Sequence, residues 1–250
     1  MLARAIKRVR DGLVASVYPE QCRVCDGPVE SYDDGVVCRP CWLDPAITVL
    51  IADPICPKCG IPLPGADGIN HSRRCGRCES FPFSAARASA TYAGAIEASI
   101  LQLKSKPRVC RRLREIILRT YRARSADLPA DVVIPVPLHR SRERERGFNQ
   151  ARLIAHAVAR ANGLRLDHRS LVRVKPTERH RAGLDAADRA RSVERAFKVV
   201  RPEVVKNASV LLVDDVFTTG STISAAARIL LDAGAARVSV LTVARVVRGG

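Results

Sequence analysis

Apolar runs of strand length alternate, from about residue 85 onward, with longer stretches in which apolar residues recur at helical spacing. The most uniformly apolar runs are rich in β-branched residues, which predicts strands buried on both faces, as in a parallel sheet. The expected strands are 85–92, 132–134, 171–177, 210–213 and 238–243, and the expected helices are 95–104, 108–124, 151–161 and 223–233. We therefore expect an α/β fold with a parallel sheet flanked by helices.

The stretch from Val210 to Thr222 begins as a strand of the buried type and ends in acidic and hydroxyl side chains. The strand is followed by Asp214 and Asp215, and then by Thr218, Thr219, Gly220, Ser221 and Thr222 at a helix start. Free backbone N–H groups, hydroxyl side chains and a glycine that permits close approach favour a phosphate site. The acids would repel a phosphate and instead suit sugar hydroxyls and Mg²⁺. The alternative is an ordinary strand–turn–helix with two solvated acids.

A second strand, 132–134, leads into a basic segment marked by proline and glycine. This segment begins with Pro137, Leu138, His139 and Arg140, and it carries further arginines at 142, 144 and 146. Loops at the carboxyl ends of parallel strands converge on one crevice. Together the two loops fit a ligand with a phosphate at one end and a pyrophosphate at the other. Because Glu143 and Glu145 interrupt the arginines, a solvated, charged helix start remains an equal alternative.

A long polar segment, 178–195, separates the strand at 171–177 from an expected return strand at 196–200. Insertions of this length and polarity often form mobile lids over a site. The chain contains neither G-x-x-x-x-G-K-[ST] nor G-x-G-x-x-G, so the two commonest phosphate-loop motifs are excluded.

Eight of the nine cysteines form four C-x-x-C pairs within residues 22–78. Two such knuckles supply the four thiolates of a zinc ribbon, which predicts structural Zn²⁺. The ligands would be Cys22, Cys25, Cys38, Cys41, Cys56, Cys59, Cys75 and Cys78. Grouping within 22–41 and within 56–78 is simplest, while interleaved grouping and a contribution from His71 stay open. Disulfides are not favoured because nothing indicates secretion, and Cys110 is expected on a helix face.

The formal net charge is +17, and arginine supplies all but seven of the 42 basic residues. Guanidinium groups suit phosphate contacts, so the charge fits anionic partners such as nucleic acid or polyphosphate, although a generally basic surface is the alternative. Residues 1–18 predict an amphipathic helix, which we expect to dock on the protein in preference to a membrane surface. No apolar stretch of about 18 residues occurs, so we expect no membrane span and a cytoplasmic location.

The cysteine array followed by this acid and hydroxyl motif closely resembles the ComF family, which combines a double zinc ribbon with a type I phosphoribosyltransferase domain. The family is tied to natural competence and DNA uptake. The resemblance covers almost the full length of the chain. Besides the cysteines, its markers are Tyr92-Ala-Gly94 with Lys104, Pro135 to Arg140, Arg146 to Ala151, Arg173 with Thr177, Ala196-Phe197, and Leu212 to Thr222.

The resemblance implies binding of 5-phosphoribosyl 1-pyrophosphate (PRPP) with Mg²⁺. Asp214 and Asp215 would be the catalytic pair that holds the ribose hydroxyls and Mg²⁺, and Thr218 to Thr222 would bind the 5′-phosphate. The loop from Pro137 to Arg140 would face the pyrophosphate. A change in composition around Phe81–Phe83 predicts a domain boundary near residue 80. With the resemblance, we expect an amphipathic helix plus a double zinc-ribbon module at 1–80 and a phosphoribosyltransferase-type domain at 81–250.

Some positions depart from related patterns. His180 and Ser192 stand where the family often has Gln and Asn, which leaves the lid contacts open. Thr218 replaces an aspartate of purine phosphoribosyltransferases, which argues against a hypoxanthine or guanine substrate. Met1 is followed by Leu2, without the N-terminal cysteine that glutamine-cleaving relatives use, so we do not expect amidotransferase activity.

The resemblance leaves open whether the protein is an enzyme, and it also fits a second function. In this alternative, the chain is a single-stranded-DNA-binding competence module in which the PRPP site is regulatory or vestigial. The arginine excess favours it, whereas an aromatic content of 4% weakens it, because single-strand platforms stack bases on aromatic rings.

Overall fold

The computed structural model of the chain describes residues 20–63, 75, 76, 78–175 and 196–247. Within them, five parallel strands form one sheet in the order β1-β7-β6-β2-β3. These strands are β1 (Ala85–Thr91), β7 (Arg237–Arg245), β6 (Ser209–Phe217), β2 (Val132–Pro135) and β3 (Arg165–Leu166). The central strand β6 is buried without interruption from Val210 to Val213, as a strand covered on both faces requires. The predicted α/β fold with a parallel sheet is confirmed.

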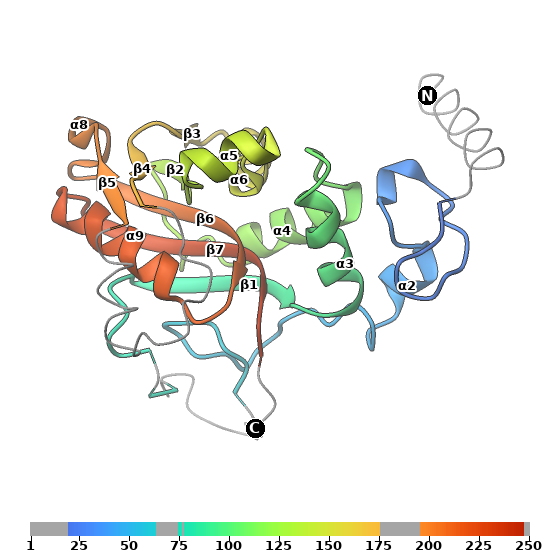
Figure 1. Cartoon of the computed structure of the whole chain (residues 1–250). Helices are drawn as coiled ribbons and strands as arrows, with labels where there is room; N and C mark the ends of the chain where they lie inside the picture. Colours follow the sequence, from blue (N-terminus) through green and yellow to red (C-terminus); the bar gives the residue numbers. More distant parts are fainter. Residues whose placement is uncertain (1–19, 64–74, 77, 176–195, 248–250) are drawn as a thin grey trace, which may run out of the picture.

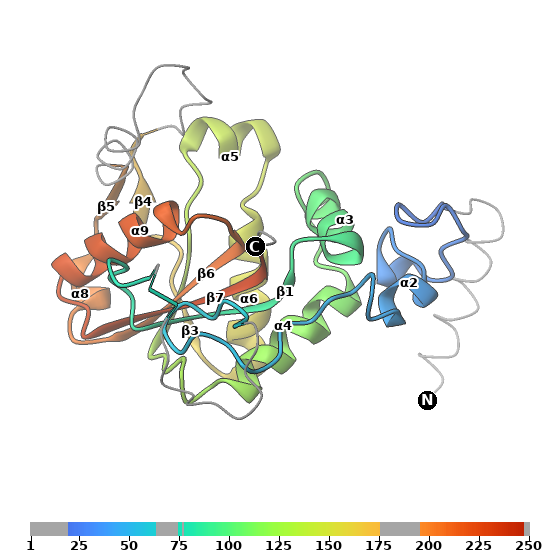
Figure 2. The same ribbon diagram turned by 90° about the horizontal axis from the view of Figure 1, so that it is seen from below.

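Helices and a pair of short antiparallel strands cover the two faces of the sheet (Figures 1 and 2). One face packs against α3 (Gly94–Leu103), α4 (Arg111–Ala123) and α6 (Gln150–Asn162). The other packs against α8 (Pro202–Val205), α9 (Ser221–Asp232) and the antiparallel pair β4 (Leu171–Arg173) and β5 (Phe197–Val199). In α4, Leu113, Ile117 and Tyr121 recur every four residues and are buried, so its arginines lie on the outward side.

The basic segment and the central strand differ from the prediction in extent. β6 continues through Asp214 and Asp215, because its ladder with β7 extends as far as the pair Phe217 and Arg245. After β2, residues Arg140–Arg146 form a short helix, α5, with His139 as its N-cap and left-handed Gly147 as its C-cap. The segment therefore contains a short charged helix, preceded by the non-helical residues 136–139. The role of this segment in binding a pyrophosphate stays a prediction.

The N-terminal cysteine region contains η1 (Tyr32–Asp34) and α2 (Arg39–Leu43) and then follows the sheet edge. The backbone N–H groups of Ile51 and Ala86 donate to the carbonyls of Ser89 and Lys58, at 3.0 and 2.7 Å. β1 is an edge strand, whose free backbone groups would otherwise be exposed, so this segment protects the edge. A domain boundary near residue 80 stays a prediction.

Several expectations concern residues outside the described ranges. They are the amphipathic helix within 1–18, the polar segment 178–195 with His180 and Ser192, and His71. Among the helices that the structure describes, none is long and apolar enough to cross a bilayer.

Candidate functional site

The loop between β6 and α9 has the features of an anion site. Thr218 and Thr219 are exposed, and Gly220 is the N-cap of the twelve-residue helix α9. The hydroxyls of Thr219 and Ser221 lie 2.9 Å apart, and the Ser221 backbone N–H donates to Thr219 Oγ1 at 3.4 Å. The first-turn N–H groups of a helix have no partners within it and carry its positive partial charge. Hydroxyl and amide donors are therefore gathered where a phosphate would lie.

Gly220 is required at this turn for two reasons. Its φ of 81° lies in the left-handed region that side chains disfavour. A Cβ on Gly220 would also lie 2.8 Å from the Phe217 ring and 3.0 Å from the Phe81 ring. Phe81 belongs to the end of the cysteine region, so a residue far away in the sequence forms part of the floor of this loop.

The two acids lie in the last part of β6, next to the loop. Asp215 donates its backbone N–H to Asp214 Oδ1 at 2.9 Å. Burial raises the pKa of Asp214 well above its ordinary value, and the charge of Asp215 raises it further, whereas Arg173 acts in the opposite direction. Such a carboxylate would be stabilised by a bound cation or by hydroxyl donors. These are the ligands expected for the pair.

The segment after β2 lies beside the acids. The Val136 backbone N–H donates to the Val213 carbonyl at 2.8 Å, one residue before Asp214. The Asn149 side chain, at the start of α6, donates to the Val136 carbonyl at 3.0 Å. The structure thus holds the segment that begins Pro137-Leu138-His139-Arg140 at the same edge of the sheet as the acid pair.

His139 and Arg140 start α5, and His139 is committed to the helix end. Its Nδ1 lies 2.8 Å from the Ser141 hydroxyl and accepts the Ser141 backbone N–H at 3.3 Å. No residue of α5 is buried. The arginines of α5 therefore remain accessible to an anionic ligand.

Arg173 and Tyr92 join the site without having been assigned a role in it from the sequence. Arg173 forms an isolated parallel bridge with His139, and its guanidinium lies 5.1 Å from the centre of the Phe197 ring. Burial lowers the pKa of Arg173, and Asp214 opposes that shift. Burial raises the pKa of Tyr92, with further contributions from Glu97 and Asp215. Arg173 and Tyr92 were both among the markers of the family resemblance. The position of Arg173 between Val172 and Val174 in an apolar strand was a further sequence signal.

The eight paired cysteines form two separate tetrads. The Sγ atoms of Cys22, Cys25, Cys38 and Cys41 lie within 4.8 Å of one another, as do those of Cys56, Cys59, Cys75 and Cys78. These two clusters confirm the simplest grouping, so interleaved grouping is wrong. All nine cysteines are free thiols. Cys110 is buried as the N-cap of α4, outside both tetrads.

The tetrads fit Zn²⁺ in both geometry and chemistry. Tetrahedral Zn–S bonds of about 2.3 Å place sulfurs about 3.8 Å apart, and the Sγ distances are 3.6 Å for Cys25–Cys38 and 3.7 Å for Cys56–Cys78. Burial favours the neutral Cys56 thiol, but backbone N–H groups, led by that of Cys59, lower its pKa to about 6. Four sulfur ligands leave no open position, so these sites are structural.

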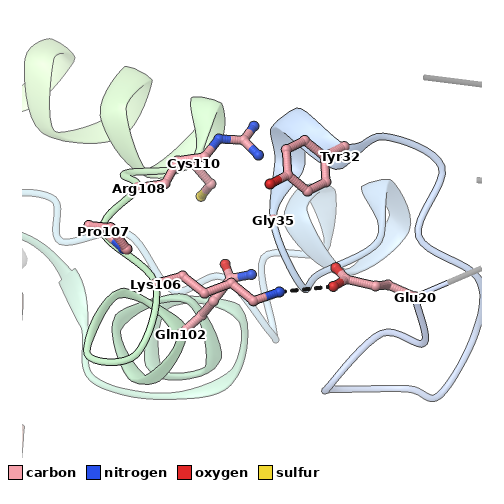
Figure 3. A pocket seen from close by; sticks show the side chains of 8 residues that line it. All are labelled: Glu20, Tyr32, Gly35, Gln102, Lys106, Pro107, Arg108 and Cys110. Carbon is pink, nitrogen blue, oxygen red and sulfur yellow. Dashed lines mark hydrogen bonds and ion pairs between the residues drawn. The ribbon is translucent and has the colours of Figure 1, made fainter. Parts of the chain in front are cut away.

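A cavity of about 310 Å³ lies between the first tetrad region and the α3–α4 connection (Figure 3). Its charged residues are already paired: Lys106 Nζ lies 3.1 Å from Glu20 Oε1, and Arg108 Nη2 lies 2.7 Å from Asp33 Oδ1. None of its lining residues belongs to the loops after β2 or β6. The cavity therefore lies where the first tetrad region packs against the α3–α4 connection, and it is separate from the candidate site.

Two family models match the chain, one over both cysteine tetrads and one over the β6–α9 part of the candidate site but not over the segment after β2. A double zinc ribbon domain family matches residues 13–79, and a phosphoribosyl transferase domain family matches residues 169–249. A solved glutamine PRPP amidotransferase from B. subtilis, in complex with ADP and GMP, matches 52% of this chain and 26% of its own, with a TM-score of 0.36 and 24% identity.

Curated relatives match the chain over most of its length or over about half of it. The DNA utilization protein YhgH of Salmonella typhimurium is 32% identical over 235 residues, which are 91% of this chain and 97% of YhgH. Competence protein F of Haemophilus influenzae is 37% identical over 119 residues, which are 46% of this chain and 50% of that protein. With its double zinc ribbon, its phosphoribosyl transferase domain and these relatives, the chain belongs to the ComF family.

Proposed function

We propose that the carboxyl edge of the sheet binds PRPP with Mg²⁺ and that the protein serves DNA uptake or utilization, as the names of its relatives indicate. The observation that carries the proposal is the hydrogen bond between Val136 and Val213, at 2.8 Å. It holds the segment beginning at Pro137 beside Asp214, and Asp214 precedes the phosphate loop on the same strand. This arrangement supports the proposal, because PRPP carries a 5′-phosphate, ribose hydroxyls and a pyrophosphate along one molecule.

In this proposal each group of residues has one role. Thr218 to Thr222 bind the 5′-phosphate through hydroxyl and amide donors. Asp214 and Asp215 accept hydrogen bonds from the ribose hydroxyls and hold Mg²⁺, and Arg173 balances the charge of Asp214. Pro137 to Arg140 face the pyrophosphate. Bound Mg²⁺ would neutralise charge on the departing pyrophosphate.

If the protein catalyses a reaction, it is the transfer of the phosphoribosyl group with release of pyrophosphate. The C1–O bond to pyrophosphate breaks as the ribose becomes oxocarbenium-like, and an acceptor nucleophile then bonds to C1. The basic start of α5 would stabilise the negative charge on the leaving group. A cytoplasmic location fits this substrate.

Replacing both acids tests the site. The double variant Asp214→Asn with Asp215→Asn should bind PRPP at least about 100-fold more weakly in the presence of Mg²⁺, because two charge-assisted contacts are lost. Isothermal titration with PRPP measures the affinity. Asp131→Asn is the control, because Asp131 lies just before β2 and accepts the Ser209 N–H at 2.7 Å, at the start of β6. Equal PRPP affinity in the double variant and the wild type would refute the assignment.

Single-stranded DNA binding is the second candidate, and α5 favours it. This helix carries four arginines and has no buried residue. On α4, by contrast, Arg111 and Arg112 face Asp34, with nearest N–O distances of 2.8 and 3.8 Å. These two arginines are therefore less available to DNA than those of α5.

A titration of labelled single-stranded DNA distinguishes the two surfaces. Arg140→Gln with Arg144→Gln removes two exposed charges from α5, and Arg114→Gln with Arg119→Gln removes two from α4 as the matched control. If α5 binds DNA, the first variant should weaken binding and reduce the salt slope by about 1.4, because each phosphate contact to a single strand contributes about 0.7 to that slope. PRPP with Mg²⁺ should compete with the DNA. Equal effects of the two variants, or no binding at low salt, would reject α5 as the DNA site.

A further inference from the structure

The phosphate loop rests on three aromatic rings. Phe81, Phe83 and Phe217 are mutually packed, with ring centroids 5.1 to 6.1 Å apart. Phe217 precedes Thr218, and the nearest ring carbons of Phe217 and Phe81 would lie 2.8 and 3.0 Å from a Cβ on Gly220. Any displacement of these rings therefore changes the surface against which the Thr218–Thr222 loop packs.

Phe81 also belongs to the second tetrad region. It packs against Cys56, Cys59 and Cys78 in one apolar cluster and against the β6–α9 core in another. The backbone N–H of Phe81 donates to the Cys78 carbonyl at 3.2 Å. The position of this ring is thus set by the fold of the second pair of knuckles.

Arg245 makes a second connection between the same two parts. It ends β7 with only 5% of its surface exposed, and its Nη1 donates to the Cys59 carbonyl. Its guanidinium carbon lies 4.7 Å from the centre of the Phe217 ring. A buried guanidinium must keep its partners, because leaving it unpaired is strongly destabilising. Arg245 consequently connects the Cys59 knuckle to the Phe217 ring beneath the phosphate loop.

The knuckle itself is fitted closely to the sheet. A Cβ on Gly60 would lie 2.4 Å from the Ala86 carbonyl, and the Gly60 N–H donates to Cys56 at 2.8 Å. Small irregular modules of this kind fold around their metal, because binding supplies much of their folding free energy. Loss of metal from this tetrad would release both Phe81 and the carbonyl that Arg245 binds.

We propose that Phe81 and Arg245 are positioning residues through which the second tetrad sets the geometry of the Thr218–Thr222 loop. Phosphate affinity at the sheet edge then depends on metal in the tetrad of Cys56, Cys59, Cys75 and Cys78. The first tetrad packs instead with α3 and α4, in the cluster on the opposite face of the sheet. This inference rests on the proposed PRPP site.

Arg87 offers a matched control for Arg245. Both arginines are 5% exposed and donate to carbonyls of the second tetrad region, Arg87 to that of Pro57 at 2.9 Å. Arg87 also donates to Asp127 at 2.9 Å, away from the phosphate loop. Arg245→Gln and Arg87→Gln should therefore both lower the melting temperature, whereas only Arg245→Gln should change the loop.

The test compares Arg245→Gln, Arg245→Lys, Arg87→Gln and Phe81→Leu in the full, zinc-loaded chain. We expect Arg245→Gln to weaken PRPP binding about tenfold, a typical effect of removing a residue that supports a metal site. Phe81→Leu should act in the same direction, Arg245→Lys should recover part of the loss, and Arg87→Gln should bind PRPP normally. The zinc content of each variant is measured in parallel, and Phe81→Leu carries the test if Arg245→Gln does not fold.

Backbone amide NMR shifts of Thr218–Thr222 in ligand-free protein provide a readout that does not depend on PRPP. Arg245→Gln keeps all three aromatic rings, so shift changes in these amides in Arg245→Gln, but not in Arg87→Gln, support positioning. This holds even if wild-type protein does not bind PRPP, a result that would defeat only the proposed function. Unchanged loop shifts in Arg245→Gln, or an equal loss of PRPP affinity in Arg87→Gln, would overturn the inference.

Discussion

Asp214 is a residue of the candidate site whose burial should lower the stability of the ligand-free folded protein. It lies in β6 directly after four fully buried residues, and burial together with the charge of Asp215 raises its pKa. The backbone cannot relieve this, because β6 remains paired with β7 on both sides of Asp214. Arg173 supplies only partial compensation. Such a cost is expected where a ligand later provides the missing counter-charge or hydrogen bonds.

The cost of Asp214 predicts a pH-dependent effect of Asp214→Asn on the ligand-free protein. Because the folded pKa is raised, the folded state retains the proton to higher pH than the unfolded state. Wild-type stability therefore falls as pH rises from the unfolded pKa, about 3.9, through the folded pKa, and the loss is complete above it. Asparagine does not titrate, so the variant should melt higher at pH 8, by about 2–4 °C for each kcal/mol relieved, with the gain vanishing toward pH 4.

Differential scanning fluorimetry across this pH range measures the difference in melting temperature. Glu145→Gln is the control, because it removes an exposed acid from α5. Its melting temperature should equal that of the wild type across this pH range. A ligand-free Asp214→Asn protein that melts below the wild type at pH 8 would contradict the argument.

At the scale of elements, the local sequence was sufficient to predict a helix or strand wherever the hydrophobic pattern and the turn residues agreed. The apolar run of β6, the Thr-Thr-Gly-Ser turn and the start of α9 occur in the predicted order, and each C-x-x-C pair joins its neighbour in sequence. Helix α5 was harder to predict, because Pro135 and Pro137 suggested a loop. Its helix depends on caps, His139 at one end and left-handed Gly147 at the other.

Other elements depend on partners that no local pattern contains. The two-residue strand β3 exists because Val132 and Val133 offer an edge to Arg165 and Leu166. The contacts of Phe81 with Phe217, and of Arg245 with Cys59, join positions 136 and 186 residues apart. A sequence can indicate that such residues are buried, but it cannot indicate their partners. The supporting residues of the site were therefore beyond prediction, whereas its ligand-facing residues could be proposed.

At the scale of the whole molecule, the two tetrads are built into different parts of one core. The first joins α4 through Asp34, whose carboxylate lies 2.8 and 3.1 Å from Arg111 Nη2 and whose carbonyl accepts the Trp42 indole N–H at 3.2 Å. Its buried residues continue without interruption into those of α3 and α4. The second tetrad region lies along β1 and contacts the end of β7 through Arg245 (Figure 1). Metal should therefore support the structure of the whole chain as well as that of the cysteine region.

Zinc content and thermal stability test this arrangement. Reduced wild-type protein should hold two Zn²⁺ per chain, one for each tetrad. Two double variants, Cys38→Ser with Cys41→Ser and Cys56→Ser with Cys59→Ser, should each retain about one Zn²⁺. A structural site loses its tetrahedral set of ligands when two of its four thiolates are removed.

A strong chelator should release both ions and lower the melting temperature of the sheet domain, because each tetrad shares apolar contacts or hydrogen bonds with that domain. Cys110→Ser, a buried cysteine outside both tetrads, should keep both ions. Metal analysis that finds no zinc in reduced wild-type protein, or a chelated protein whose sheet melts as before, would refute the idea that metal supports this core.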